Sequence, residues 1–247
     1  MYKYLKELRK EHKPIYCLKL DIHHFYQSIN HKILKSLLRK KFKDVKLLRT
    51  LDNIIDSYPW KVWIPIGSYL SQYLANFYLS YFDHYCKEYL HSKCILRYMD
   101  DVVILSTSKN ELHIYLRYIK KYLCFNLQLK LKKNYQIFNI TKRGIDFVWY
   151  VYYPHCTLLR KRIKNNVKRL VKLIKTKDTI NEHEYCGINS YRWWIKHCDG
   201  WRLYNRFIIP IADKVFRYWW YEIVECKVTK SRCNKYYSNF IHWIDKK

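Results

Sequence analysis

Two adjacent aspartates, Asp100 and Asp101, interrupt an apolar stretch over residues 94–105 (CILRYMDDVVIL). The apolar runs on both sides predict two short strands joined by a tight turn, a β-hairpin. Neighbouring carboxylates are costly to desolvate unless a cation or another partner compensates their charge. A solvated turn would also accept two acids, but the flanking residues have the composition of buried strands. The hairpin therefore favours a fold that presents an acidic turn to a cation.

A third carboxylate, Asp21, stands at the end of the stretch IYCLKLD, residues 15–21. The alternation of apolar and polar residues in this stretch predicts a strand that leads into a turn. Hard oxygen ligands from neighbouring strands are what Mg²⁺ prefers in proteins. Asp21 together with Asp100 and Asp101 therefore favours a metal site over a solvated hairpin turn.

The rest of the chain alternates between helical and strand patterns. We expect a helix from Ile29 to about Ile55, a turn around Pro65 and Gly67, and helices over 71–90 and 111–126. The stretches QIFNI (136–140) and FVWYVYYP (147–154) predict strands, and from Leu158 onwards the pattern is basic and helical. Helices mixed with antiparallel strands, followed by helices alone, predict an α+β fold with a helical appendage.

The chain is strongly basic, with 48 Lys and Arg against 20 Asp and Glu and a formal charge of +28. A surplus of lysine alone would follow from an A+T-rich genome, but that bias does not explain the scarcity of acids. The charge, with 18% aromatic residues, favours a nucleic-acid partner. No apolar window is long enough for a membrane span or a signal peptide. We therefore expect a soluble cytoplasmic protein with no membrane partner.

Nine cysteines are scattered without a C-x-x-C pair, which argues against a disulfide framework. His183, Cys186, His197 and Cys198 could in principle form a zinc site, but their spacing matches no standard zinc motif. We interpret them as ordinary core or surface residues.

The residues around the acids resemble the reverse transcriptases. The hallmark of that family is similar to YMDD at 98–101, and its first palm motif is similar to LDIHHFYQSINHKIL at 20–34. The resemblance implies a right-hand polymerase palm followed by a helical thumb. It further implies that two Mg²⁺ ions, with Mn²⁺ as a substitute, bind Asp21, Asp100, Asp101 and the backbone carbonyl of Ile22. Such ions activate a primer 3′-hydroxyl and stabilise the leaving pyrophosphate.

By the same resemblance, the substrates are dNTPs and the partners are a template RNA and the RNA–DNA duplex. Tyr26 stands where the family carries the aromatic ring that excludes a ribose 2′-hydroxyl. Tyr98 and Met99 would contact substrate as part of the hallmark motif. Lys133 matches a lysine thought to protonate pyrophosphate, although the neighbouring Lys132 leaves the register open.

The motif IPIGSYLSQYLANFYLS at 64–80 resembles the segment that contacts template and nucleotide. Most relatives carry Gln before the glycine and Ser-Pro after it, whereas this chain has Ile66 before Gly67 and then Ser71-Gln72. That pattern resembles reverse transcriptases of diversity-generating retroelements. It implies low fidelity, because Ile66 cannot donate a positioning hydrogen bond, and an accessory variability protein as a partner, in a bacterial or phage-infected cell.

The resemblance also divides the chain. Residues 1–14 resemble the last helix of the fingers, 15–157 the palm, and 158–247 a helical thumb with a basic, aromatic C-terminal extension. GIDFVWY at 144–150 resembles the primer grip, with Trp149 in place of a glycine. Two other readings stay open: a retron, group II intron or phage-defence reverse transcriptase, and a catalytically impaired nucleic-acid-binding remnant, which the short region before Asp21 favours.

Overall fold

The computed structural model describes residues 1–58, 61–65 and 67–225. The chain divides into two compact units, which are treated separately below. Unit 1 consists of Met1–Val148 and Tyr152–His155. Unit 2 consists of Trp149–Val151 and the chain from Cys156 onwards. The predicted C-terminal extension falls largely on residues 226–247, which lie outside the described residues.

Unit 1 is built on a four-stranded antiparallel sheet with strand order β2-β3-β1-β4. Its strands are β1 (Tyr16–Asp21), β2 (Ile95–Tyr98), β3 (Asp101–Ser106) and β4 (Gln136–Asn139). The predicted strand at 15–21, the predicted strand at 136–140 and the hairpin at 94–105 are all confirmed. The α+β class is confirmed as well, because helices cover the sheet and follow it.

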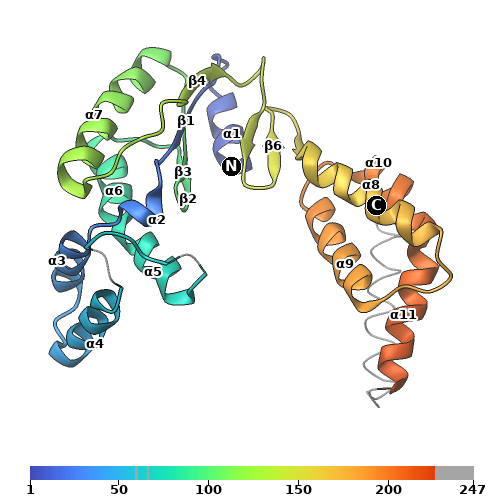
Figure 1. The fold of residues 1–247 in the computed structure, drawn as a ribbon. Helices are drawn as coiled ribbons and strands as arrows, with labels where there is room; N and C mark the ends of the chain where they lie inside the picture. Colours follow the sequence, from blue (N-terminus) through green and yellow to red (C-terminus); the bar gives the residue numbers. More distant parts are fainter. Residues whose placement is uncertain (59–60, 66, 226–247) are drawn as a thin grey trace. The chain divides into compact units, whose positions relative to one another are not determined.

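The two faces of the sheet carry different cores, because alternate residues of β1 point to opposite sides. Leu18 and Leu20 face the larger core, which is covered by helices including α7 (Lys109–Leu127). Cys17 faces a smaller core closed by Leu5 of α1 (Tyr2–Arg9). Figure 1 shows α7 on one side of the strands and α1 on the other. Lys19 and Asp21 lie on the same face of the sheet as Cys17, beyond the end of this smaller core.

The helix predicted from Ile29 to Ile55 is wrong as a single element. The structure has α2 (Phe25–Ser28), α3 (His31–Lys41) and α4 (Val45–Asp56). Asp44 starts α4 as its N-cap, accepting hydrogen bonds from the backbone N–H groups of Lys46 (2.8 Å) and Leu47 (3.2 Å). Apolar residues at helical spacing continue across this break, so periodicity alone does not reveal it.

The helix predicted over residues 71–90 is confirmed in outline, with two interruptions. It consists of α5 (Tyr69–Tyr78), α6 (Ser80–His84) and a π-helical turn at Tyr85–Tyr89. Tyr78 is fully buried, and its hydroxyl donates a 2.7 Å hydrogen bond to the carbonyl oxygen of Leu127 at the end of α7. Burial raises the pKa of Tyr78 to about 12, so its hydroxyl remains a donor at neutral pH.

A second, three-stranded sheet has the order β5-β6-β7. It consists of β5 (Ile145–Phe147), β6 (Tyr150–Tyr152) and β7 (Thr157–Leu159). The single strand predicted over 147–154 is wrong, because the chain reverses at Val148, which has φ +57°. The helical pattern predicted from Leu158 is also wrong at its start: Leu158 and Leu159 belong to β7, and the helix begins at Lys161.

The rest of unit 2, as far as the structure describes it, consists of helices and helical turns. They are α8 (Lys161–Lys175), α9 (Glu182–Lys196), α10 (Trp201–Leu203), a π-helical turn (Tyr204–Ile208), a 3₁₀ turn (Ile209–Ile211) and α11 (Ala212–Glu225). α8 buries Ile163, Val167, Val171 and Ile174 on one face and exposes its cations on the other. α9 begins with a capping box formed by Asn181 and Glu184.

Within the described ranges, no helix combines the length and apolarity needed to cross a bilayer. The seven cysteines in this part of the chain all carry free thiols. The same part contains no group of three His, Cys, Asp or Glu side chains arranged to hold a metal, around Cys186 and Cys198 or elsewhere.

Candidate active site

The three acids of the sequence motif lie at the same end of the four-stranded sheet. β1 and β3 pair so that Asp21 is directly opposite Asp101, which places both side chains on one face of the sheet. Asp100 occupies the two-residue turn between the paired residues Tyr98 and Asp101. The backbone N–H of Ile22 donates a 3.3 Å hydrogen bond to the carbonyl oxygen of Asp100. The turn is thereby tied to the end of β1.

Asp100 and Asp21 influence each other electrostatically. Burial raises the pKa of the Asp100 carboxyl above its ordinary value of 3.8, and the negative charge of Asp21 raises it further. Oδ1 of Asp21 is buried and accepts no hydrogen bond from any described residue. A buried carboxylate oxygen without a donor carries an uncompensated desolvation penalty. Both observations indicate a site that would be stabilised by a cation.

Two lysines supply positive charge at these acids. Nζ of Lys132 donates a 2.7 Å hydrogen bond to Oδ2 of Asp21, and this bond raises the pKa of Lys132. The backbone N–H of Lys132 also donates to the carbonyl oxygen of Asp21 at 2.8 Å. Nζ of Lys19 lies 3.7 Å from Oδ1 of Asp101 and donates to the carbonyl oxygen of Asp146. The two ammonium groups therefore partly neutralise carboxylates that would hold divalent cations.

The acids do not form a ready-made metal cage, since no triad of potential ligands converges in the described part of the chain. The donor set nevertheless suits Mg²⁺, because it consists of hard carboxylate oxygens on two adjacent strands and one of these oxygens lacks a partner. Asp21, Asp100 and Asp101 are the side chains that would hold the ions, with the Ile22 carbonyl as an additional ligand.

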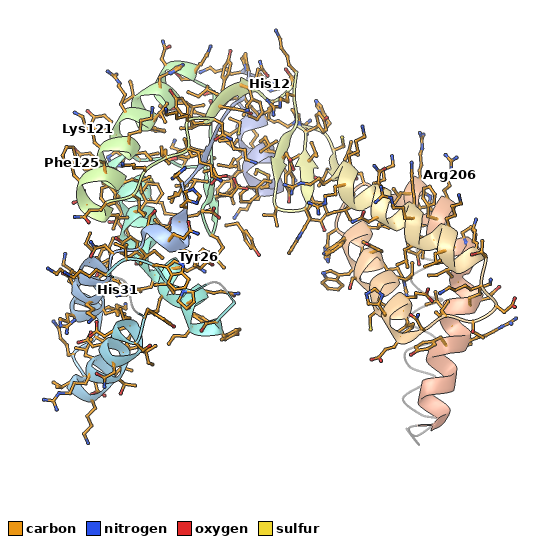
Figure 2. All side chains as sticks on the ribbon, viewed as in Figure 1. His12, Tyr26, His31, Lys121, Phe125 and Arg206 are labelled. Carbon is orange, nitrogen blue, oxygen red and sulfur yellow. The ribbon has the colours of Figure 1, made fainter. Side chains whose placement is uncertain are left out.

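Tyr26 lies beside the acidic turn. Its hydroxyl donates a 3.7 Å hydrogen bond to Sδ of Met99, and Tyr26 is labelled in Figure 2. Burial, followed by the charge of Asp100, raises the pKa of Tyr26. Tyr98 is half exposed next to this group. The structure thus brings Tyr26, Met99 and Asp100 together, as the sequence motifs predict.

The segment before Gly67 is attached to the same region. The backbone N–H of Ile64 donates to the carbonyl oxygen of Tyr26 at 2.9 Å, and His31 Nε2 lies 3.0 Å from the carbonyl oxygen of Trp63. Gly67 has φ +106°, a conformation that favours glycine, and no described atom lies within 4 Å of the place a Cβ would take. The backbone at Gly67 is therefore open to an approaching molecule.

The remaining residues of this motif differ in environment. Ile66 lies outside the described residues. Ser71 is buried on α5, and its hydroxyl has no hydrogen-bond partner among the residues that the structure describes. Gln72 is exposed. Their substrate contacts stay predictions.

Arg97, which the sequence interpretation missed, supports the turn from β2. Its guanidinium forms a fork with the Asp83 carboxylate, with distances of 2.8 Å and 2.6 Å. It also donates to Oδ1 of Asn76 at 3.0 Å and to the carbonyl oxygen of Met99 at 3.1 Å. Met99 has φ +54°, which is unfavourable for a residue with a side chain. Arg97 therefore stabilises a strained turn, a role that only the tertiary contacts of Asp83 reveal.

Of the two candidate lysines, the structure brings Lys132 rather than Lys133 to the acids. The Lys133 side chain is exposed. Its assignment as a proton donor stays a prediction. Lys132 was the alternative that the sequence left open, and Lys19 is the cation that the interpretation missed. The second departure from the motifs, Trp149, stacks on Trp194 of α9 with ring centroids 5.8 Å apart. Within unit 2, an indole thus fills the position at which a glycine was expected.

Comparison with known proteins agrees with this geometry. The profile described as "Reverse transcriptase (RNA-dependent DNA polymerase)" matches residues 2–150, which is more than half of the chain and includes all three acids. The chain belongs to the reverse transcriptase family. Polymerases of this family are nucleotidyltransferases that use divalent metal ions. No curated protein matches the sequence.

Solved structures of telomerases share the reverse transcriptase fold. Apo telomerase from Candida tropicalis superposes with a TM-score of 0.56 and 13% identity, over 75% of this chain and 39% of that chain. Telomerase from Candida albicans, solved with a fragment of telomeric RNA, gives a TM-score of 0.50 and 13% identity, over 86% of this chain and 43% of that chain. The chain thus spans about two fifths of each. At this identity the likeness concerns the fold.

Proposed function

We propose that this chain is the palm and thumb of an RNA-directed DNA polymerase that copies a template RNA into cDNA. The observation that carries the proposal is the register of β1 and β3, with Asp21 opposite Asp101 and a partly buried Asp100 in the adjoining turn. Membership of the reverse transcriptase family supports it. The RNA complex of the telomerase neighbour suggests an RNA partner here too.

Each residue of the site has a role in this proposal. Asp21, Asp100 and Asp101 hold two Mg²⁺ ions, for which Mn²⁺ substitutes. When bound, these ions activate the primer 3′-hydroxyl and stabilise the departing pyrophosphate. Tyr26 lies beside Asp100, where its ring would collide with a ribose 2′-hydroxyl and so favour dNTPs. Gly67 presents its open backbone to the nucleotide.

The finer part of the proposal is a diversity-generating retroelement. Ile66 before Gly67, followed by Ser71-Gln72, supports this type over retron, group II intron and phage-defence enzymes. The enzyme would make error-prone cDNA in the cytoplasm of a bacterial or phage-infected cell, together with an accessory variability protein. The charge of +28 supports binding to RNA and to the RNA–DNA duplex.

Primer extension tests the activity. The full chain is incubated with an RNA template, a DNA primer, dNTPs and Mg²⁺, with and without the accessory protein. We expect incorporation by the wild type and a loss of at least about 100-fold in Asp100→Ala, because the metal site is incomplete. Asp178→Ala, which changes an exposed acid between α8 and α9, is the matched control and should retain activity. Incorporation that persists in Asp100→Ala would refute the metal assignment.

The two ion pairs favour a second candidate function. Because Lys132 and Lys19 already neutralise Asp21 and Asp101, a nucleic-acid-binding protein without catalysis could retain the same acids. An absence of incorporation under every condition, together with tight duplex binding, would support this alternative.

Replacement of Ile66 with Gln tests the proposed subfamily. Gln can form a positioning hydrogen bond near the incoming nucleotide, which we expect to improve discrimination at adenine templates by about tenfold. Sequencing of cDNA made on an adenine-rich template gives the error spectrum. Ile114→Gln, at an exposed position of α7, is the control and should leave the errors unchanged. An unchanged spectrum in Ile66→Gln would count against low fidelity caused by this residue.

A further inference from the structure

Unit 2 contains a concave site that the polymerase proposal does not use. It has a volume of about 290 Å³ and lies between the exposed face of α8 and the chain from Cys198 to Phe207. Gly200 forms part of its wall, and a Cβ there would come within 2.7 Å of Cγ2 of Ile195. The wall is fixed to β7, because the Asp199 N–H donates to the Thr157 carbonyl oxygen at 2.8 Å and the Thr157 N–H donates to Oδ2 of Asp199 at 2.7 Å.

Four cations and one acid line this site. Lys164 and Lys168 are one helical turn apart on α8, so their side chains share a face, and Arg202 and Arg206 have the same spacing. Asp199 is the single acidic residue of the lining, and Thr157 already occupies one of its oxygens. Four positive charges against one negative charge leave the site with a surplus of three (4 − 1).

Two of these cations lie against the same aromatic ring. Lys168 Nζ and Arg206 Cζ each lie 5.8 Å from the centroid of the same ring, that of Phe207. In the ranges that the structure describes, no ion pair involves Lys164, Lys168, Arg202 or Arg206. Like charges that line one cavity repel each other, and a bound anion would offset this repulsion. Arg206 can be found by its label in Figure 2.

A second basic concavity, on α3, shows the contrast. It is lined by Lys32, Lys35, Ser36, Arg39, Lys40 and Lys43. There, Lys35 pairs with Asp56 and Arg39 pairs with Asp52, both from α4. Two of the cations at α3 are therefore ion-paired within the fold, whereas none of the four cations of the site in unit 2 forms an ion pair in the described ranges.

We propose that the cavity between α8 and residues 198–207 is a binding site for a phosphate group. Arginine forks match the oxygens of phosphate in a bidentate way, and lysines add charge. The volume accommodates a phosphate group with part of its ester but is small for a drug-sized ligand. The group would come from a nucleic-acid backbone or from free phosphate or pyrophosphate. The site does not depend on nucleotidyl transfer, since none of its residues belongs to the acidic turn.

Binding in EDTA tests the site without any contribution from catalysis. The full chain carrying Lys168→Gln and Arg206→Gln is compared with a control carrying Arg169→Gln and Lys172→Gln, which removes the same charges from exposed positions of unit 2 outside the lining. One arm measures anisotropy of a labelled RNA–DNA duplex. The other measures the rise in Tm with pyrophosphate at constant ionic strength. Circular dichroism verifies the fold of each variant.

We expect the double variant of the cavity to bind at least about tenfold more weakly than the control. A loss in the duplex arm assigns the site to backbone phosphate, and a loss confined to the pyrophosphate arm assigns it to free phosphate. Lys168→Arg with Arg206→Lys retains the charges and should retain binding. If the cavity variant equals the control in both arms, the proposal is overturned.

Discussion

At the residue scale, the ammonium group of Lys132 and a divalent cation would compete for the same carboxylate. Lys132 Nζ is 2.7 Å from Oδ2 of Asp21, and both side chains are partly exposed, so this ion pair contributes modestly to stability. We expect Lys132→Gln to bind Mn²⁺ about two- to fivefold more tightly, because the competing charge is gone. Electron paramagnetic resonance of free Mn²⁺ measures the affinity directly.

Lys133→Gln is the matched control for this prediction. The side chain of Lys133 is exposed and forms no ion pair with Asp21 in the described part of the chain, so the Mn²⁺ affinity of Lys133→Gln should equal that of the wild type. The same pair of variants separates the two lysines in catalysis. If Lys133 donates the proton to pyrophosphate, Lys133→Gln lowers incorporation without changing metal affinity. Equal Mn²⁺ affinities in all three proteins would contradict the competition.

Asp100 links the protonation of the site to the stability of the fold. Burial and the neighbouring Asp21 raise the pKa of Asp100 above 3.8, so the folded state binds this proton more tightly than the unfolded chain does. The ionised carboxyl therefore destabilises the fold at pH 7, and the penalty disappears below the unfolded pKa. We expect Asp100→Asn in EDTA to raise Tm by roughly 2 °C at pH 7, with a gain that shrinks as the pH falls towards 3.8.

Calorimetry over this pH range checks the prediction, with Asp178→Asn as an exposed control that should not change Tm. Addition of Mg²⁺ should reverse the order, because a bound cation stabilises the wild type but finds an incomplete ligand set in Asp100→Asn. A variant that is less stable than the wild type at pH 7 in EDTA would show that the Asp100 carboxylate is not under electrostatic strain.

At the element scale, the β2–β3 hairpin depends on the contacts of Arg97. Its guanidinium bonds to Asp83, Asn76 and the carbonyl oxygen of Met99, and only 12% of its side chain is exposed. We expect Arg97→Ala to lower the free energy of unfolding by about 2–3 kcal/mol, because Asp83 is left partly buried without its partner. Urea denaturation measures this loss.

A surface ion pair provides the comparison. Lys35→Ala breaks a pair with Asp56, whose side chain is 62% exposed, and should cost less than about 1 kcal/mol. Arg97→Lys should fall between the two, since it keeps the charge but loses the fork. Equal losses in Arg97→Ala and Lys35→Ala would mean that the hairpin does not depend on this network.

The elements that are predicted well from the sequence are those with a clear local pattern of apolar and polar residues. β1 alternates apolar and polar residues, the hairpin has an apolar run on each side of an acidic turn, and α7 follows a helical repeat from its Ser108 cap to Leu127. The break between α3 and α4 escapes this reasoning, because the apolar spacing continues through Asp44. The reversal between β5 and β6 escapes it too, since Val148 adopts φ +57°, which β-branched residues rarely do.

The candidate site shows the same division. The acids and Tyr26 are found from local motifs, and the structure brings Asp100, Met99 and Tyr26 together as expected. Lys132, Lys19 and Asp83 act across the fold, and their partners lie 111, 82 and 14 residues away in the chain (132 − 21, 101 − 19 and 97 − 83). No local pattern encodes such pairings, so only the tertiary structure shows that Lys132, and not Lys133, forms the hydrogen bond to Asp21.

At the scale of the whole molecule, positive charge is the dominant property. The formal charge of +28 is spread over both units, with cations on the exposed face of α3 and on that of α8. Exposed indoles such as Trp193 add surfaces on which unpaired bases can stack. These features of each unit suit binding to a polyanion, and they are independent of the metal site.

Salt dependence of binding is therefore the prediction that belongs to this scale. A chain that contacts six or more phosphates of an RNA–DNA duplex should lose affinity by about 1,000-fold between 50 and 200 mM salt. Titrations in EDTA with wild type and Asp100→Ala should give the same steep dependence, because the acids are not needed to hold the backbone. A log–log slope shallower than about −2 would mean that fewer than three phosphates are contacted, and that lysine-rich composition rather than polyanion binding explains the charge. A steep slope in both proteins, combined with incorporation by the wild type alone, would identify a polymerase. A binding remnant would give the same slope without incorporation, because it needs Asp100 only as a residue of the turn.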